Sequence, residues 1–447
     1  MSSAPSSSEE TTGPDRPVSP AAARLALAAM AVAAAAGCVD ITISTDGGVN
    51  EESPPEAGWV TAAAGLSHTC GLTAGGGLFC WGSDARGQLG VGPRTPRDSA
   101  ADAGDCADPC VLRPRPVDAP LAAFDTVVSG RVHSCALTDA GRAYCWGGND
   151  RGQVGDSTLV DRPAPVPVAG DLTFASLTAG GEHTCGITRV ERHLYCWGDN
   201  FWGQLGRGSR SSSPVRVPLF VLRRARFADA GSEHTCALAG EEAIVLCWGR
   251  NHRGQLGLGY ISDVPETSPV AVLTAAAAVS AGMHHTCALS PREGTARCWG
   301  WNDEGAVGIG RESGFEPDPR AVSGGLTYGD ISAGGGHTCA VGTGGTLFCW
   351  GDDLRGQLGI GSPGDFSTAP AAVAHGGRFR GVTSGGGEGA ETTGASEDLD
   401  GTRYAGHACA VDVAGALLCW GSNAHGELGD GTQADRASPV PVPEPGG

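Results

Sequence analysis

Cysteine and histidine recur together along this chain, at spacings that could bind a metal or form disulfides. Of the 17 cysteines, most fall into close pairs, in which Trp-Gly follows the second member and a histidine stands two residues before the first. The pairs are Cys70 with Cys80, Cys135 with Cys145, Cys185 with Cys196, Cys236 with Cys247, Cys287 with Cys298, Cys339 with Cys349, and Cys409 with Cys419. The histidines are His68, His133, His183, His234, His285, His337 and His407.

Two chemistries fit one such group. A tight turn would place the two cysteines opposite each other in an antiparallel hairpin, where facing Cα atoms lie about 4.5–5.5 Å apart, within disulfide range. Alternatively, His68 and Cys70 on one strand face, with Cys80 opposite, could offer three ligands to zinc and leave an open fourth position. Because seven identical catalytic zinc sites would be odd, we expect disulfides, structural histidines, and neither a metal nor another cofactor.

Two further cysteines, Cys106 and Cys110, stand close together between Pro93 and Pro116. We expect them to form a local disulfide. Four aspartates surround them, but they lack the spacing and the closing glutamate of a calcium loop. This segment is therefore interpreted as a solvated acidic loop.

Motifs that would indicate catalysis are missing from the sequence. It contains no Gly-x-Ser-x-Gly elbow, no phosphate-binding Walker loop and no zinc-protease helix. The net charge of −19 and the pI of about 5.0 argue against nucleic acid, since phosphate binding needs clustered basic residues. We therefore expect a protein that is not an enzyme and does not bind nucleic acid.

The elements that must position these residues are short strands in a repeat. The histidines recur about every 51 residues, with longer intervals after the first and before the last copy. Thr-Cys-Ala-Leu and Leu-Phe-Cys-Trp are typical of strands, and glycine-bearing turns separate them. In each copy, Asn or Asp and two free positions then precede Gly-Gln-Leu-Gly or a close relative. One unit cannot bury its apolar faces alone, whereas a closed ring of units can, so the pattern predicts an all-β propeller.

The two free positions are the best candidates for recognition, because variable loops on a rigid ring are where binding residues concentrate. Trp, Phe and Arg dominate interface hot spots. The predicted partner-binding residues are Phe201, Trp202, Arg151, His252, Arg253, Arg86 and Arg355. A second variable set precedes the histidines and includes Glu182, Glu233, Met283 and His284. The alternative is that arginine or an aromatic residue is ordinary here and serves the fold.

The N-terminus predicts export. The apolar run from Leu25 to Gly37 is too short to span a bilayer and suits the hydrophobic part of a signal peptide. Ala35-Ala36-Gly37-Cys38 resembles the lipobox of bacterial lipoproteins, which implies cleavage before Cys38 and acylation of its thiol. We therefore expect a signal peptide over residues 1–37, a flexible lipid-anchored tether over 38–57 and the propeller over 58–447, with insertions near 93–116 and 385–403.

The repeat resembles that of the regulator-of-chromosome-condensation family, in Gly-x-x-His-Thr, Cys-Trp-Gly-x-Asn and Gly-Gln-Leu-Gly over residues 59–443. The resemblance implies a seven-bladed propeller. It also implies closure by mixing of the chain ends, with Pro439–Pro443 pairing beside the strand that starts near Trp59. Members of the family include a guanine-nucleotide exchange factor, a plant ultraviolet photoreceptor and secreted bacterial β-lactamase inhibitors.

Three functions remain open. An exported, acidic chain fits an extracytoplasmic scaffold best, a monomer that binds an envelope or extracellular protein or glycan through one face and is held at the membrane by lipid. The second is a cell-envelope hydrolase or lyase with its site in the propeller mouth. The third, a regulator like the exchange factor, would need a cytosolic or nuclear partner. A photoreceptor would need clustered tryptophans, whereas most tryptophans here follow the second cysteine of a pair, and the extra Trp202 and Trp301 do not make a cluster.

Overall fold

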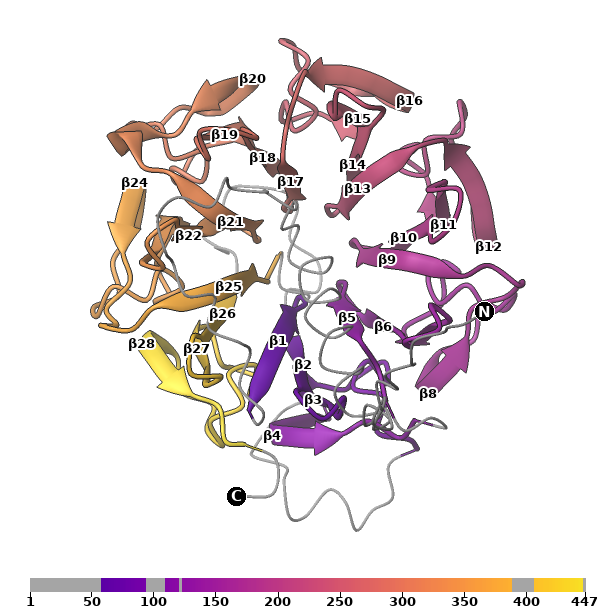
Figure 1. Ribbon diagram of the computed structural model, residues 1–447, viewed down its shortest axis with the longest axis horizontal. Helices are drawn as coiled ribbons and strands as arrows, with labels where there is room; N and C mark the ends of the chain where they lie inside the picture. The colour runs from indigo at the N-terminus through magenta and orange to yellow at the C-terminus, as the bar shows by residue number, and fades with distance from the viewer. Residues whose placement is uncertain (1–57, 94–108, 120–122, 388–405, 445–447) are drawn as a thin grey trace, which may run out of the picture.

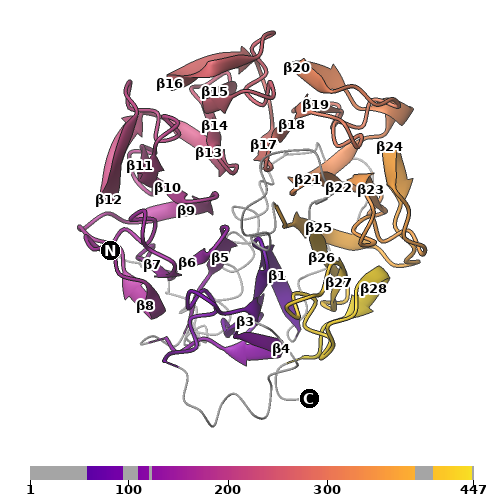
Figure 2. The same cartoon turned by 180° about the vertical axis from the view of Figure 1, so that it is seen from behind.

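The computed structural model describes residues 58–93, 109–119, 123–387 and 406–444. These residues form seven four-stranded antiparallel sheets arranged as blades around a central channel (Figures 1 and 2). This confirms the predicted all-β, seven-bladed propeller. A short 3-10 helix, Ser323–Gly325, is the one helix of the described residues, so none of them forms a helix able to cross a bilayer.

In each blade the strands follow one another in sequence from the channel to the rim. Blade 1 consists of β1 (Trp59–Ala64), β2 (His68–Thr73), β3 (Leu78–Ser83) and β4 (Cys110–Pro116), and blade 2 of β5 (Thr126–Ser129), β6 (His133–Leu137), β7 (Ala143–Gly147) and β8 (Arg162–Pro167). Blade 3 consists of β9 (Phe174–Ala179), β10 (His183–Thr188), β11 (Leu194–Asn200) and β12 (Ser211–Leu222), and blade 4 of β13 (Ala225–Ala230), β14 (His234–Ala239), β15 (Ile244–Asn251) and β16 (Ser262–Leu273). Blade 5 consists of β17 (Ala278–Ala281), β18 (His285–Leu289), β19 (Ala296–Trp301) and β20 (Phe315–Ala321), and blade 6 of β21 (Tyr328–Ala333), β22 (His337–Gly342), β23 (Leu347–Asp352) and β24 (Phe366–Ala372). Blade 7 consists of β25 (Phe379–Ser384), β26 (His407–Asp412), β27 (Leu417–Gly421) and β28 (Arg436–Pro441).

The second and third strands of every blade are joined by a disulfide. Cys70 lies directly opposite Cys80 in the β2–β3 register, and the Cα atoms of the pair are 4.1 Å apart. The other six predicted hairpin pairs are confirmed at the same Cα separation: Cys135 with Cys145, Cys185 with Cys196, Cys236 with Cys247, Cys287 with Cys298, Cys339 with Cys349, and Cys409 with Cys419. Their sulfurs are therefore bonded to one another and are not thiolate ligands.

Two predictions about the remaining cysteines cannot be compared with the fold. Cys106 and the lipid-acceptor Cys38 lie outside the described residues. A Cys106–Cys110 bridge and acylation of Cys38 therefore stay predictions.

The core lies between the blades. The leucine or valine of each Gly-Gln-Leu-Gly segment is fully buried, as is the tryptophan after each second cysteine. Trp197 Nε1 donates a hydrogen bond to Gln153 O of the preceding blade at 2.9 Å, and the other six equivalent tryptophans make the same bond. Each Gly-Gln-Leu-Gly segment is thus a wedge that holds the next blade.

Closure of the ring differs from the expectation. β28 pairs with β27, and blade 1 consists of β1 to β4 alone, so the chain ends do not mix in one blade. The seam between blades 7 and 1 instead repeats the contacts of the other junctions: Trp81 Nε1 donates to Glu427 O at 2.8 Å, and Trp59 N to Gly415 O at 2.9 Å. The predicted insertion near 93–116 is also too long, because β4 begins at Cys110.

A ring of glycines surrounds one end of the channel. The carbonyl of each accepts a backbone hydrogen bond from the preceding blade, and the last bond, from Gly386 N to Gly65 O at 2.9 Å, closes the circle. The glycines are Gly65, Gly130, Gly180, Gly231, Gly282, Gly334 and Gly385. A Cβ atom on Gly180 would lie 2.4 Å from Gly231 O and 2.5 Å from His183 Cε1. The close approach of neighbouring blades therefore requires glycine here.

The disc has two unlike faces. The connections from first to second strand and from third to fourth strand share one face, which we call the loop face. The disulfide-bonded hairpin turns, and the connections from one blade to the next, share the other, which we call the hairpin face. All the predicted partner-binding residues belong to third-to-fourth-strand turns and so lie on the loop face.

Candidate binding face

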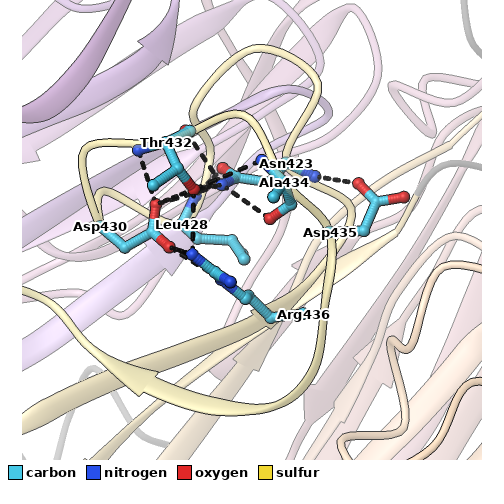
Figure 3. A network of polar contacts seen from close by, with 7 residues as sticks. All are labelled: Asn423, Leu428, Asp430, Thr432, Ala434, Asp435 and Arg436. Atoms are coloured by element: carbon cyan, nitrogen blue, oxygen red, sulfur yellow. Dashed lines mark hydrogen bonds and ion pairs between the residues drawn. The ribbon is translucent and has the colours of Figure 1, made fainter.

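Each third-to-fourth-strand turn is fixed by the Asn or Asp that opens it. In blade 7, Asn423 Oδ1 accepts from Leu428 N at 3.0 Å, and Asn423 Nδ2 donates to Ala434 O at 3.1 Å (Figure 3). Asp430 accepts from Thr432 N at 2.8 Å and pairs with Arg436 at 2.7 Å. The bond to the buried Leu or Val N–H recurs in the other six blades. The predicted turn cap is thus present in every repeat.

The second free position of these turns also has a fixed backbone. Trp202 N donates to Gln204 Oε1 at 2.9 Å, and Arg253 N donates to Gln255 Oε1 at the same distance. Equivalent bonds hold Arg86, Arg151 and Arg355. The fold therefore uses the backbone here and leaves the side chain open to variation, as binding residues on a rigid scaffold require.

Three of the predicted arginines pair with carboxylates of a neighbouring blade. Arg86 Nε lies 2.6 Å from Asp161 Oδ2. Arg355 Nη1 lies 3.2 Å from Asp435 Oδ2, and Arg151 Nε lies 3.3 Å from Glu182 Oε2. Asp161 and a second carboxylate, Asp150, raise the pKa of the Arg86 guanidinium. These pairs link successive blades, so these side chains serve the fold whatever else they contact.

Blade 3 presents a different arrangement. The guanidinium carbon of Arg250 lies 4.1 Å from the centre of the Trp202 ring, and Arg250 Nη1 lies 2.7 Å from Glu233 Oε2. Phe201 packs edge-on against Trp202 with ring centres 4.9 Å apart, and about half of its side chain is exposed. The carboxylate thus holds the guanidinium against the indole, and the two aromatic rings form a rigid, partly exposed pair.

The surface continues onto blades 4 and 5. The His252 and His284 rings meet edge-on with centres 5.3 Å apart, and Arg253 lies over the Trp301 ring at 5.5 Å. Trp301 packs on Met283. We call the combined surface the blade 3–5 patch: Phe201, Trp202, Glu233, Arg250, His252, Arg253, His284 and Trp301. It unites both variable sets that the sequence singled out.

Two members of the patch, Arg250 and Trp301, were not predicted. Both occupy the position after Cys-Trp-Gly, where the other copies have Ser, Gly or Asp. That variation was visible in the sequence. What the sequence could not show is that this position neighbours the turn of the preceding blade, because the contact joins different repeats.

The repeated histidines are structural. His133 Nε2 lies 2.9 Å from Thr184 Oγ1 of the next blade, and Thr184 Oγ1 donates to Gln153 O at 2.8 Å. The hydroxyl proton is therefore committed, so the histidine must donate from Nε2. Complete burial lowers the pKa of His133 to about 3, with a further lowering by His183. The neighbouring cysteines, which would have to supply the other two zinc ligands, are bonded to each other.

The channel is lined by the first strand of every blade, around a cavity of about 270 Å³. Two acids lie in it. Asp229 accepts from Ala230 N, Ala281 N and Thr178 Oγ1 at 2.7–3.0 Å, and Asp330 accepts from Val382 N at 3.0 Å. Burial raises the pKa of both carboxyl groups, that of Asp330 to about 6. Each carboxylate accepts a hydrogen bond from the next blade, so both stabilise the contact between neighbouring blades.

Comparison with known families covers most of the chain. A family model described as the RCC1-like domain matches residues 37–327, and models of the regulator of chromosome condensation (RCC1) repeat match residues 330–357 and 414–447. The ultraviolet-B receptor UVR8 of Arabidopsis thaliana is 30% identical over 73% of this chain and 71% of the receptor. The probable E3 ubiquitin-protein ligase HERC6 of Homo sapiens is 32% identical over 48% of this chain and 21% of its own length.

Solved structures agree on the architecture. Prp20p of Saccharomyces cerevisiae superposes with a TM-score of 0.63 at 21% identity, over 74% of this chain and 80% of Prp20p. Human WBSCR16 superposes with a TM-score of 0.62 at 20% identity, over 79% of this chain and 95% of WBSCR16. At these identities the likeness shows the fold alone. Together with the family models and UVR8, it establishes that the chain belongs to the RCC1-like family of seven-bladed β-propellers.

Proposed function

We propose that this protein is a non-catalytic scaffold that binds another protein through its loop face, with the blade 3–5 patch at the centre of the contact. The observation that carries the proposal is the Phe201–Trp202–Arg250 arrangement, in which Glu233 fixes the guanidinium over the indole and the Gln204 side chain fixes the backbone of Trp202. Rigid aromatic side chains beside arginine are the residue types that contribute most to the affinity of protein interfaces.

Relatives support the class of function without naming the partner. The structure of Prp20p is described with its binding to Gsp1p and histones, and a second structure shows yeast RCC1 (Prp20) with Kap60. Those partners belong to Prp20p. For this chain they support only a propeller that acts by binding proteins. In the channel, the engagement of Asp229 and Asp330 with neighbouring blades favours a binding role over a hydrolase or lyase.

We also propose that the protein acts outside the cytoplasm, anchored through lipid on Cys38. One disulfide in each of the seven blades supports this location, because such bonds persist in oxidising compartments and are rare in the cytosol. The partner would then be a protein of the bacterial envelope or of the extracellular space. A glycan is the alternative ligand of the same patch.

Site-specific photo-crosslinking in native envelopes tests the proposal. A photoreactive phenylalanine analogue at position 201 should form a defined protein adduct, whereas the same group at Val190, 82% exposed on the hairpin face, should not. With the captured protein purified, Trp202→Ala should weaken binding about 30-fold or more, equivalent to about 2 kcal/mol for a hot-spot residue.

The matched control is Leu354→Ala, the equivalent turn in blade 6, which should leave affinity unchanged. Equal protein adducts from positions 201 and 190, or an unchanged affinity of the Trp202→Ala protein, would refute the loop face as the binding surface. An adduct with glycan and none with protein would assign the patch to a carbohydrate instead.

A further inference from the structure

Arginines gather on the hairpin face of blade 3, away from the loop face. The cluster consists of Arg189, Arg192, Arg223, Arg224 and Arg226, all exposed. Two backbone hydrogen bonds hold the contributing segments, from Ala225 N to Arg192 O at 2.7 Å and from Gly240 N to Arg224 O at 3.1 Å. Arg192 Nη2 also donates to Arg226 O at 2.9 Å. The positive charges are thus presented on a fixed surface.

Most of these arginines form no ion pair, although Glu191, Glu241 and Glu242 are exposed in the same hairpin turn and in the adjoining one. Among the described residues, Arg192, Arg223, Arg224 and Arg226 have no carboxylate oxygen within 4.0 Å, in contrast to the paired arginines of the loop face. Exposed arginines without an ion pair, in a chain of net charge −19, suit an anionic ligand.

Two of the arginines also occupy unfavourable backbone conformations. Arg192 has φ 55° and Arg224 has φ 54°, in the left-handed region that disfavours any residue with a Cβ atom. The hairpin position of Arg192 is glycine in five other blades, again with positive φ: Gly76, Gly141, Gly294, Gly345 and Gly415. Blade 4 has Ala243 at this position, with φ 49°, so the fold does not need a charged side chain here.

The chain enters the propeller on this same face. β1 starts there, since Trp59 N bonds to Gly415 O in the hairpin turn of blade 7. Cys38 stands 20 positions before Gly58, and the tether predicted from the sequence would, at that length, have an average reach of about 25 Å. A lipid on Cys38 would therefore hold the bilayer next to the hairpin face.

We propose that the hairpin face lies on the membrane and that the arginine cluster binds the phosphate groups of anionic lipids. Guanidinium groups suit phosphate oxygens, and basic residues near a bilayer are attracted to its negative surface. The orientation of the disc rests on the proposed lipid anchor, whereas the affinity of the cluster for anionic lipid does not. The loop face would then point away from the membrane, free to meet a partner.

The full chain carrying Cys38→Ala cannot be acylated. Its binding to vesicles therefore measures the contribution of the arginine cluster without that of a lipid anchor. The chain should bind phosphatidylglycerol-containing vesicles and not phosphatidylcholine vesicles, with affinity falling as salt rises. Arg192→Gly with Arg224→Gly should weaken this binding about 25-fold, from about 5-fold per arginine. Both changes relieve a positive φ, so thermal stability should hold or rise, and lost binding cannot be ascribed to unfolding.

The matched control is Arg207→Gln with Arg210→Gln, which removes the same charge from exposed positions of the same blade outside the hairpin face. Equal losses in the two variants, or no loss in the cluster variant, would overturn the proposal. So would binding to DNA or an acidic glycan with none to anionic vesicles. Crosslinking at position 201 tests protein binding by the loop face independently of vesicle binding. Either proposal, loop-face binding or lipid binding by the cluster, can therefore fail without the other.

Discussion

At the scale of single residues, the hydrogen bond from the repeated histidine to the next blade is missing at one of the seven junctions. In six junctions a histidine Nε2 bonds to a Thr or Ser hydroxyl of the next blade. His337 has no such partner, because blade 7 has Ala408 where the others have a hydroxyl. Both ring nitrogens of this buried histidine are therefore unsatisfied, at a cost to stability.

Ala408→Ser should repair this link. The new hydroxyl would accept from His337 and donate to Gln357 O, which among the described residues accepts from Trp420 Nε1 alone. Ser134 shows that a serine fits the equivalent place in blade 2. We expect the free energy of unfolding to rise by about 1 kcal/mol, measured by denaturant titration. Ala410→Ser, on the same strand, is the control and should destabilise; a loss of stability in Ala408→Ser would contradict the repair.

At the scale of elements, the first-to-second-strand turns depend on the glycine ring. Gly180→Ala would place a methyl group 2.4 Å from Gly231 O, which only a shift of a whole blade can relieve. We expect a loss of about 3 kcal/mol or more, seen as a lower denaturation midpoint. Gly329→Ala in β21 meets no atom within 4 Å and should change stability by less than about 0.5 kcal/mol. A mild effect at Gly180 would mean that the blades are not in tight register.

The same elements show what the sequence could predict. Hairpin disulfides, capped turns and buried tryptophans follow from patterns within one repeat, and the structure has all of them. Ring closure depends on contacts between repeats, so the expected exchange of chain ends was wrong. The partners of Arg86 and the stacking of Arg250 on Trp202 likewise cross blade boundaries. Spacing within a repeat carries no information about such contacts.

At the scale of the whole molecule, the buried histidines make stability depend on acid. Burial holds the pKa of six of them at about 3 and that of His183 at about 4, against about 6.5 when the chain unfolds. Below pH 6.5 the unfolded chain takes up protons that the folded one does not, so stability is lost as pH falls toward 3–4.

The expected result is a free energy of unfolding that falls steeply between pH 6.5 and pH 5, by up to about 1.4 kcal/mol per histidine per pH unit. Five carboxyl groups act in the opposite direction, because burial raises their pKa values and so favours the folded state in acid, but the seven histidines outnumber them. They are Asp125, Glu182, Asp229, Asp330 and Asp353. Chemical denaturation across this range measures the slope. A flat profile would show that the histidines are not neutral and buried.

The seam between blades 7 and 1 has one more consequence. No strand is shared there, the contacts match those of the other junctions, and β1 starts and β28 ends on the hairpin face in adjacent blades. The contacts between blades therefore do not distinguish blade 1 from the others as the place where the chain must begin. Circular permutants opened in any hairpin-face connection between blades should fold, so whole-repeat duplication and later relocation of the ends offer this architecture a route to diversify one blade at a time.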